Sequence, residues 1–186
     1  MNDFCLTCDE LKEVIYRPDI MYMMRKHANQ TRNDGSPYWL HPLKVASILA
    51  SLDTDDSDSF ATPTLIRGAL FHDLLEDTDT TFEELKSLYG EQVADLVQEL
   101  TNNCTGVEKH PNLLKHAKTY SPSAKMIKLC DRWCNVHDSV FRSNWDVQKT
   151  KKYAKEGLEL IEAMSPIPIQ VINLTASAIR FFSCIV

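Results

Sequence analysis

The chain has 186 residues, of which 44% are hydrophobic and 25% are charged, ordinary proportions for a globular protein that can bury a core. Its formal net charge of -6 disfavours binding to nucleic-acid polymers and to anionic membranes, so an anionic ligand would need a local basic cluster. The N-terminal residues lack the basic and apolar regions of a signal peptide, and no apolar run approaches the roughly 20 residues that span a bilayer. We therefore expect a cytoplasmic protein.

Apolar residues recur at helical spacing along almost the whole chain, and no stretch alternates between apolar and polar residues between hairpin turns. This pattern predicts an all-α fold, which we expect to form a single domain over residues 1–186. The turn residues Asn33-Asp-Gly-Ser-Pro37 separate the second predicted helix from the third. The predicted helices cover about ten segments: 8–15, 19–30, 41–52, 62–75, 81–88, 90–103, 110–118, 122–140, 146–163 and 168–183.

Several helix ends have specific signals. Thr80-Thr-Phe-Glu83 fits a capping box at a helix start, and Gly90 is expected to end that helix. Ser121-Pro122 places a cap residue before a proline at the first helical position. The acidic stretch 53–59 is interpreted as a solvated loop, because it lacks the central glycine and the closing glutamate of a calcium loop.

The cysteines favour a reduced protein. Cys5 and Cys8 have the spacing of half a zinc site, but no second half follows. Cys130 and Cys134 lie one helical turn apart in an apolar segment, where buried thiols usually behave as small hydrophobic groups. We expect neither pair to form a structural zinc site.

The densest group of ionisable residues on an apolar stretch lies in Ala69–Thr78. His72 is one helical turn from Glu76, and Asp73 is one turn from Asp77, so we expect all four on neighbouring parts of one helix face. Charged groups on a buried face need a cation or a hydrogen-bond network. An adjacent imidazole and carboxylate suit manganese, iron or zinc. The alternative is a helix end with solvated acids and a core histidine.

Two further side chains are candidate metal ligands. His41 precedes Pro42, which suits the first helical position, so the imidazole is expected at a helix start. Asp131 lies in another predicted apolar helix, with Lys128 and Asn135 at i-3 and i+4 on its own face. One face of that helix is therefore polar, while the other is expected in the core.

Together, the candidate ligands reproduce in order the H…HD…D pattern of the HD superfamily. Their flanking residues resemble one branch of it, the hydrolase domain of RelA/SpoT-type proteins and the stand-alone small alarmone hydrolases, which remove the 3′-pyrophosphate of ppGpp and pppGpp. The resemblance covers about residues 20–140 and rests on four blocks: Arg25-Lys-His27 with Gln30, Arg32, Gly35, Pro37-Tyr38 and His41-Pro42; His72-Asp-Leu-Leu-Glu-Asp-Thr78; Tyr89-Gly-Glu-Gln-Val-Ala-Asp-Leu-Val97 with Leu100-Thr101; and Lys128-Leu-Cys-Asp-Arg-Trp-Cys-Asn135.

This resemblance implies an HD-domain helical bundle that hydrolyses guanosine tetra- or pentaphosphate to GDP or GTP and pyrophosphate. It implies one divalent ion, usually Mn²⁺ in the family, bound by His41, His72, Asp73 and Asp131. Glu76 and Asp77 match the pair that positions or deprotonates the attacking water. The expected substrate-binding residues are Arg25, Lys26, Arg32, Tyr38, Lys128 and Asn135.

The departures from the family pattern leave two alternatives open. His137 stands where the family commonly carries an arginine, and residues 102–121 match poorly. The chain could therefore be an HD phosphohydrolase that acts on another phosphorylated nucleotide such as NADPH. It could also be a catalytically silent module that binds an alarmone, although such a module has no need to keep buried charges.

The length of the chain predicts a hydrolase without the synthetase and regulatory domains of long RelA/SpoT proteins. Residues 141–186 match no motif, and we expect them to form closing helices. Their apolar residues could also contribute to a homo-oligomer surface.

Overall fold

The computed structural model describes residues 18–52, 60–141 and 146–186 and has an all-α architecture over these ranges. Short 3₁₀ turns, Gly106–Glu108 and Ile169–Val171, precede two of the helices. The α-helices are α2 (Pro18–Lys26), α3 (Leu40–Leu52), α4 (Pro63–Phe71), α5 (Leu74–Asp77), α6 (Phe82–Tyr89), α7 (Glu91–Leu100), α8 (Lys109–Ala117), α9 (Pro122–Phe141), α10 (Val147–Ala163) and α11 (Ile172–Ile185).

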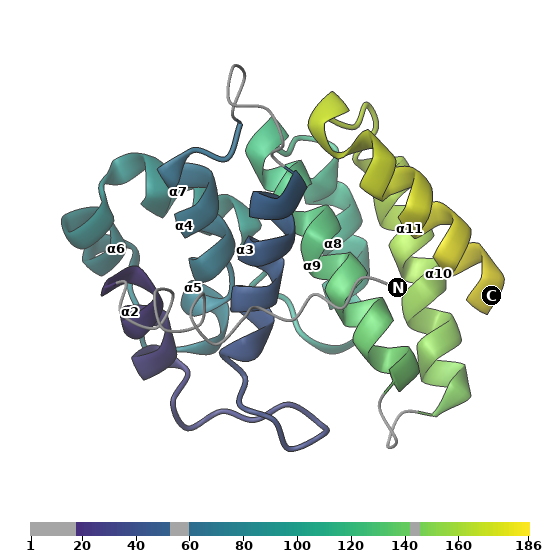
Figure 1. The fold of residues 1–186 in the computed structure, drawn as a ribbon, viewed down its shortest axis with the longest axis horizontal. Helices are drawn as coiled ribbons and strands as arrows, with labels where there is room; N and C mark the ends of the chain where they lie inside the picture. Colours follow the sequence, from purple (N-terminus) through teal and green to yellow (C-terminus); the bar gives the residue numbers. More distant parts are fainter. Residues whose placement is uncertain (1–17, 53–59, 142–145) are drawn as a thin grey trace.

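Three helices form the centre of the bundle and carry the residues that matter for the site. Helix α3 packs against both α4 and α9, while α7 packs against α4 and α6. Figure 1 shows α2 and α6 at one end of the molecule and the α10–α11 hairpin at the other, with α3, α4 and α9 between them. Segments far apart in the sequence therefore meet in the middle of the fold.

The packing around α4 is close because Gly68 has no side chain. A Cβ at this position would lie 2.5 Å from Cδ2 of Leu96 in α7 and 3.0 Å from Cδ1 of Ile127 in α9. Leu96 and Ile127 belong to the buried core, together with Phe71 and Leu74 at the end of α4 and the start of α5. This core holds α4 at a defined distance from α9, and apolar burial is the main term that stabilises such a contact.

The helix that we predicted over 62–75 is wrong in one respect, because α4 ends at Phe71 and α5 begins only at Leu74. Asp73 has φ -101° and ψ -2°, a sparsely populated conformation that interrupts the regular helix. His72 and Asp73 therefore lie at a junction and not on one continuous helix face with Glu76 and Asp77. Apolar periodicity does not reveal the break, since Phe71 and Leu74 on either side of it are both buried.

Other helix boundaries agree with the sequence to different degrees. Gly90, with φ +90°, ends α6, and Ser121 caps α9 by accepting a hydrogen bond from the backbone N–H of Ala124. The cap of α6 is Thr81 and not Thr80, because the Thr81 hydroxyl accepts from the backbone N–H of Glu84. The N-cap residue of α6 therefore lies one residue later in the chain than the predicted capping box placed it.

The predicted helix over 19–30 is also shorter than expected, since α2 ends at Lys26 and the chain then turns. Gly35, with φ +82°, lies in the predicted turn before α3, and Thr31 pairs with Pro37 across that turn. The predicted helix 8–15, the pair Cys5 and Cys8, and the acidic stretch 53–59 lie outside the described residues. Within the described ranges, none of the helices has the length and apolar character needed to cross a membrane.

The thiols of Cys130 and Cys134 are free and buried on α9, as expected for core cysteines. Burial raises the pKa of both thiols, that of Cys134 to about 12, so neither group is a thiolate near neutral pH.

Candidate metal centre

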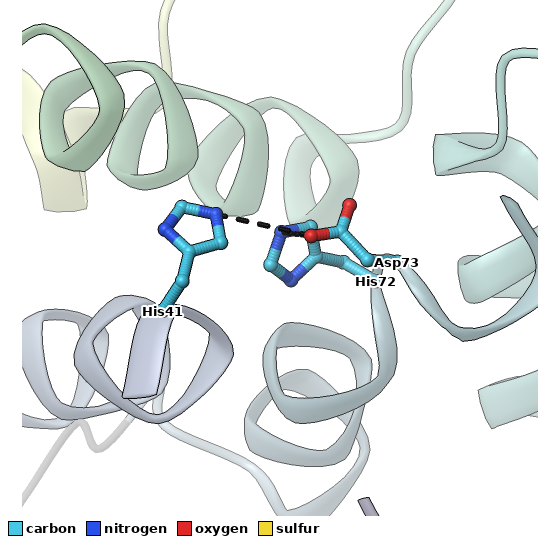
Figure 2. A group of neighbouring side chains, drawn as sticks. All are labelled: His41, His72 and Asp73. Atoms are coloured by element: carbon cyan, nitrogen blue, oxygen red, sulfur yellow. Dashed lines mark ion pairs between the residues drawn. The ribbon is translucent and has the colours of Figure 1, made fainter. Parts of the chain in front are cut away.

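The candidate metal ligands come from α3, from α9 and from the junction that follows α4. His41 is at the start of α3, His72 and Asp73 lie at the junction of α4 and α5, and Asp131 is in the middle of α9. Figure 2 shows the side chains of His41, His72 and Asp73 pointing toward one another from α3 and from this junction. The close packing of α3 and α4 against α9 therefore brings together residues that are up to 90 positions apart.

The atoms that could bind a metal ion are close to each other. One ligand atom from each of His41, His72 and Asp73 lies within 4.8 Å of the other two. His72 Nε2 is 3.1 Å from Asp73 Oδ2, and His41 Nε2 is 3.8 Å from the same oxygen. Asp131 Oδ1 adds a second carboxylate oxygen, at 3.1 Å from His41 Nε2 and 3.9 Å from His72 Nε2. Two imidazoles and two carboxylates thus converge on one small volume.

The hydrogen bond made by His72 leaves one of its ring nitrogens available for a cation. Its Nδ1–H donates to the backbone carbonyl of Ala69 at 2.8 Å, which assigns the unprotonated lone pair of the neutral ring to Nε2. Within the described part of the chain, this buried Nε2 makes no hydrogen bond, although two carboxylates lie nearby. A buried nitrogen lone pair beside two anions fits a metal ion well, because the ion offsets both desolvation costs.

The carboxylates of the cluster are ionised. Burial by itself raises the pKa of Asp131, but the charge of Lys128 and the hydrogen bond with His41 outweigh it and hold the pKa well below its usual range. Burial also opposes ionisation of Asp73, and the neighbouring charge of His72 lowers its pKa more strongly. Both groups therefore have the charge state that a metal ligand needs.

The pKa values of His41 and His72 are shifted in opposite directions. Burial lowers the pKa of His41, although Asp131 partly opposes this effect. Burial also disfavours a charged His72, but Asp73 and Asp131 outweigh it and raise the pKa of His72 to about 9. The charges that attract this proton would equally attract a divalent cation, so proton and cation compete for the same position.

Glu76 and Asp77, the predicted catalytic pair, line the same pocket as His41, Asp73 and Asp131. Glu76 pairs with Lys109 Nζ at 2.5 Å and accepts a hydrogen bond from the backbone N–H of Asn102 at 3.1 Å. The Tyr38 hydroxyl lies 3.0 Å from Asp77 Oδ2 and 2.7 Å from Asp73 Oδ2. Burial and the charge of Asp73 raise the pKa of Asp77, so this carboxyl accepts a proton more readily than a solvated aspartate.

The pocket has a volume of about 280 Å³, close to the lower end of the range for small-molecule sites. Four of the six predicted substrate-binding residues line it: Arg32, Tyr38, Lys128 and Asn135. The Arg32 guanidinium donates to Asn135 Oδ1 at 2.9 Å, and the Asn135 amide donates to Asp131 Oδ1. Lys128 Nζ lies 3.3 Å from Asp131 Oδ2. Lys128 and Asn135 thus lie on the same side of α9 as Asp131, as their spacing predicted.

The structure does not bring the other two, Arg25 and Lys26, into this pocket. Both line a second hollow together with Tyr22, Asn29, Gln30, Thr78 and Asp79. The Lys26 ammonium pairs with Asp79 at 3.0 Å and with Glu84 at 3.1 Å, so it has acidic partners within the fold. Two of the six expected substrate-binding residues therefore lie outside the pocket that the other four line.

Six residues that line the pocket were not predicted as site residues: Thr31, Asn33, Asn102, Lys109, Leu113 and Tyr153. Two of them contact the predicted catalytic residue Glu76. Lys109 and Asn102 belong to the segment 102–121, which matched the family poorly, and they reach Glu76 across 33 and 26 residues. Asn102 also holds this segment together, since its side chain donates to the Lys109 carbonyl and accepts from Asn112. A lysine at the start of a predicted helix was the only local signal, and it is too common to indicate a site.

Comparisons with known proteins agree with this geometry. A model of the HD-domain family matches residues 20–161. The guanosine-3′,5′-bis(diphosphate) 3′-pyrophosphohydrolase MESH1 of Danio rerio is 33% identical over 151 residues, which cover 78% of this chain and 81% of that protein. The human MESH1 is 32% identical over 149 residues, which cover 77% and 80%. The guanosine-3′,5′-bis(diphosphate) 3′-pyrophosphohydrolase of Aquifex aeolicus is 40% identical over 146 residues, covering 75% of this chain and 19% of that protein.

A solved structure shows the same fold. It is described as a metazoan orthologue of SpoT that hydrolyses ppGpp and plays a role in starvation responses. It matches with a TM-score of 0.75 at 26% identity, covering 88% of this chain and 92% of that one. The resemblance inferred from the four sequence blocks and the all-α HD fold are both confirmed. The chain belongs to the HD-domain family, in its branch of guanosine-3′,5′-bis(diphosphate) 3′-pyrophosphohydrolases.

Proposed function

We propose that this protein hydrolyses the 3′-pyrophosphate of ppGpp and pppGpp and that it does so with one divalent ion, Mn²⁺, bound by His41, His72, Asp73 and Asp131. The observation that carries the metal requirement is the convergence of two imidazoles and two ionised carboxylates on one volume. The substrate follows from the relatives, which are named as hydrolases of this nucleotide.

The ligand set supports the choice of metal. Imidazole nitrogen together with carboxylate oxygen suits Mn²⁺, Fe²⁺ and Zn²⁺, whereas a closed structural zinc site usually includes thiolates. The buried cysteines of α9 have raised pKa values and are not among the clustered ligand groups. When bound, a divalent ion supplies positive charge that acidifies water and neutralises phosphate oxygens.

The catalytic step that we assign is a hydrolysis at the phosphorus joined to O3′ of the ribose. Oxygen of a water molecule forms a bond to this phosphorus, the P–O3′ bond breaks, and the electron pair leaves with O3′. Glu76 and Asp77 position the water molecule and accept the proton that it loses. O3′ gains a proton as GDP or GTP departs. Both carboxylates line the pocket within one helical turn of Asp73.

Basic side chains in the pocket are suited to hold the phosphates of the substrate. Arg32, Lys109 and Lys128 line the same pocket, although the chain as a whole has a net charge of -6. Charge-assisted hydrogen bonds from such groups are stronger than neutral ones. We assign Tyr38 and Asn135 to substrate binding as well, because both line this pocket and contact its acidic or basic residues. Arg25 and Lys26 would have to act from the second hollow.

The test is release of pyrophosphate from ppGpp by the wild-type protein with Mn²⁺ and with EDTA. We expect turnover with Mn²⁺, none with EDTA, and no turnover for Asp73→Asn or Asp131→Asn. Asp95→Asn, which removes an exposed carboxylate on α7, is the matched control and should leave turnover unchanged. Phosphate release from NADPH with ppGpp left intact would refute the substrate, and equal turnover in EDTA would refute the metal.

Three expectations stay predictions: that the protein is cytoplasmic, that it forms a homo-oligomer, and that residues 1–186 form a single domain. Gel filtration with light scattering would test the oligomeric state directly.

A further inference from the structure

We propose that His27 and Gln30 are positioning residues that hold Asp77 in place from the loop after α2. This inference rests on the proposed function, because it assigns them a role in the same reaction. Neither residue touches the ligand cluster itself. Gln30 reaches the backbone carbonyl of Asp77 directly, and His27 contacts both Gln30 and the Tyr38 ring.

The first connection runs through the side chain of Gln30. Its Nε2 donates to the backbone carbonyl of Asp77 at 2.5 Å, 47 residues away. Its Oε1 lies 2.7 Å from Nδ1 of His27. A backbone carbonyl can only accept a hydrogen bond, so the amide nitrogen of Gln30 must face it and the amide oxygen must face His27. His27 therefore carries its proton on Nδ1 and donates it to Gln30.

The second connection runs through Tyr38. The His27 ring, which is fully buried, packs on the Tyr38 ring with centroids 4.9 Å apart and planes inclined by 36°. The Tyr38 hydroxyl carries one hydrogen and lies within hydrogen-bond distance of both Asp73 Oδ2 and Asp77 Oδ2. The position of His27 thus affects the backbone of Asp77 through Gln30 and its carboxylate through Tyr38.

Helix α5 needs such support because it is very short. It has only four residues, Leu74–Asp77, and an isolated helix of this length is not stable in water. The carbonyls of the last helical turn have no partner inside the helix, and the Asp77 carbonyl is one of them. Gln30 supplies this missing donor. We infer that the contact determines where the C-terminal end of α5, and with it the Asp77 carboxylate, lies over the cluster.

A purely structural role for the loop is a weaker explanation of the Gln30 side chain. The loop already has its own backbone bonds, since Gln30 N–H donates to the His27 carbonyl at 3.0 Å and Tyr38 N–H donates to the Gln30 carbonyl at 2.9 Å. The side-chain amide is not needed for either bond. The hydrogen bond from the Gln30 amide to the Asp77 carbonyl instead connects the loop with the C-terminal end of α5.

The experiment measures kcat and KM in a double-mutant cycle with Mn²⁺ present. Gln30→Ala should lower kcat by about 100-fold, the loss typical of a catalytic group displaced by about 1 Å, and should leave KM nearly unchanged. Gln30→Glu should lower kcat as well, because a carboxylate cannot donate to the Asp77 carbonyl. In an Asp77→Asn background, adding Gln30→Ala should change the residual kcat by no more than about twofold, since both changes disable the same group.

The matched control is Glu99→Ala, which removes another long-range side-chain contact to the backbone. Glu99 accepts from the backbone N–H and the hydroxyl of Ser121 at the start of α9 and does not line the pocket. It should lower the melting temperature without changing kcat. Nitrogen-15 NMR of histidine supplies a reading that does not depend on activity: His27 should be protonated at Nδ1, and Gln30→Ala should alter this resonance.

Three results would overturn the inference: a kcat for Gln30→Ala within about twofold of the wild type, an equal loss in both backgrounds, or a His27 protonated at Nε2. Failure of the proposed function is distinguishable from these. If the wild-type protein leaves ppGpp intact but hydrolyses NADPH or another nucleotide, the substrate is wrong, and the same cycle on that nucleotide still decides whether Gln30 acts through Asp77.

Discussion

Replacing Lys128 by methionine should destabilise the protein strongly without metal and much less with metal. Lys128 is only 8% exposed, and its Nζ lies 3.3 Å from Asp131 Oδ2. Methionine has a similar length and no charge, so it removes the ammonium group while it fills most of the same space. The Asp131 carboxylate then loses its nearest cation in the part of the fold that the structure describes.

The size of the effect follows from the burial of both partners. Removing one partner of a buried ion pair costs about 3–5 kcal/mol, because the remaining buried charge loses its main counter-charge. Among the described residues, the Asp131 carboxylate keeps only its contacts with the two imidazoles and the Asn135 amide. For a protein of this size, about 1 kcal/mol changes the melting temperature by roughly 2–4 °C. The melting temperature of Lys128→Met in EDTA should therefore fall by about 6–20 °C. A bound divalent cation would restore positive charge beside Asp131 and should reduce this loss.

The assay is thermal unfolding followed by circular dichroism, in EDTA and in saturating Mn²⁺. Binding to the folded state alone raises the melting temperature, and this rise should be larger for Lys128→Met than for the wild type. Lys125→Met, on the same helix but bonded to the carbonyl of Pro166, is the control and should show the same metal response as the wild type. An equal loss for Lys128→Met in EDTA and in Mn²⁺ would refute the reasoning.

Two further predictions concern the pocket. Glu76→Gln should retain Mn²⁺ binding, measured by calorimetry, but lose most of its turnover of ppGpp, because Glu76 lines the pocket outside the ligand cluster; loss of both properties together would make Glu76 a ligand instead. Arg32→Ala should raise KM for ppGpp, because it removes a cation that lines the pocket, whereas Arg25→Ala, in the second hollow, should leave KM close to the wild-type value. The reverse order in steady-state kinetics would restore Arg25 as a phosphate-binding residue.

The sequence predicted correctly which residues lie close together when they belong to one helix or are adjacent in the chain. Lys128 and Asn135 were expected on the same face as Asp131, and both contact its carboxylate. This succeeded because the helical period alone decides which residues of a regular helix share a face. The all-α fold followed from the same periodicity, since the pattern extends over most of the chain.

The errors occur where a local pattern has no information about distant segments. The break between α4 and α5 escaped prediction because buried apolar residues lie on both sides of it, and because the unusual conformation of Asp73 depends on its surroundings. Arg25 and Lys26 were expected to bind substrate together with Arg32, but they line a different pocket. The turn after α2 separates them, and Lys26 is held by Asp79 and Glu84 from beyond α5.

The sequence by itself determined the chemical character of the site: an adjacent histidine and aspartate on an apolar background, a second histidine at a helix start, and a second aspartate on a helix with one polar face. Only the tertiary structure decided which groups surround that site. Lys109 and Asn102 reach Glu76, and Gln30 reaches the Asp77 carbonyl, through contacts across 26 to 47 residues. Such contacts depend on how the helices pack, and burial of their apolar faces determines that packing without regard to the spacing of polar residues along the chain.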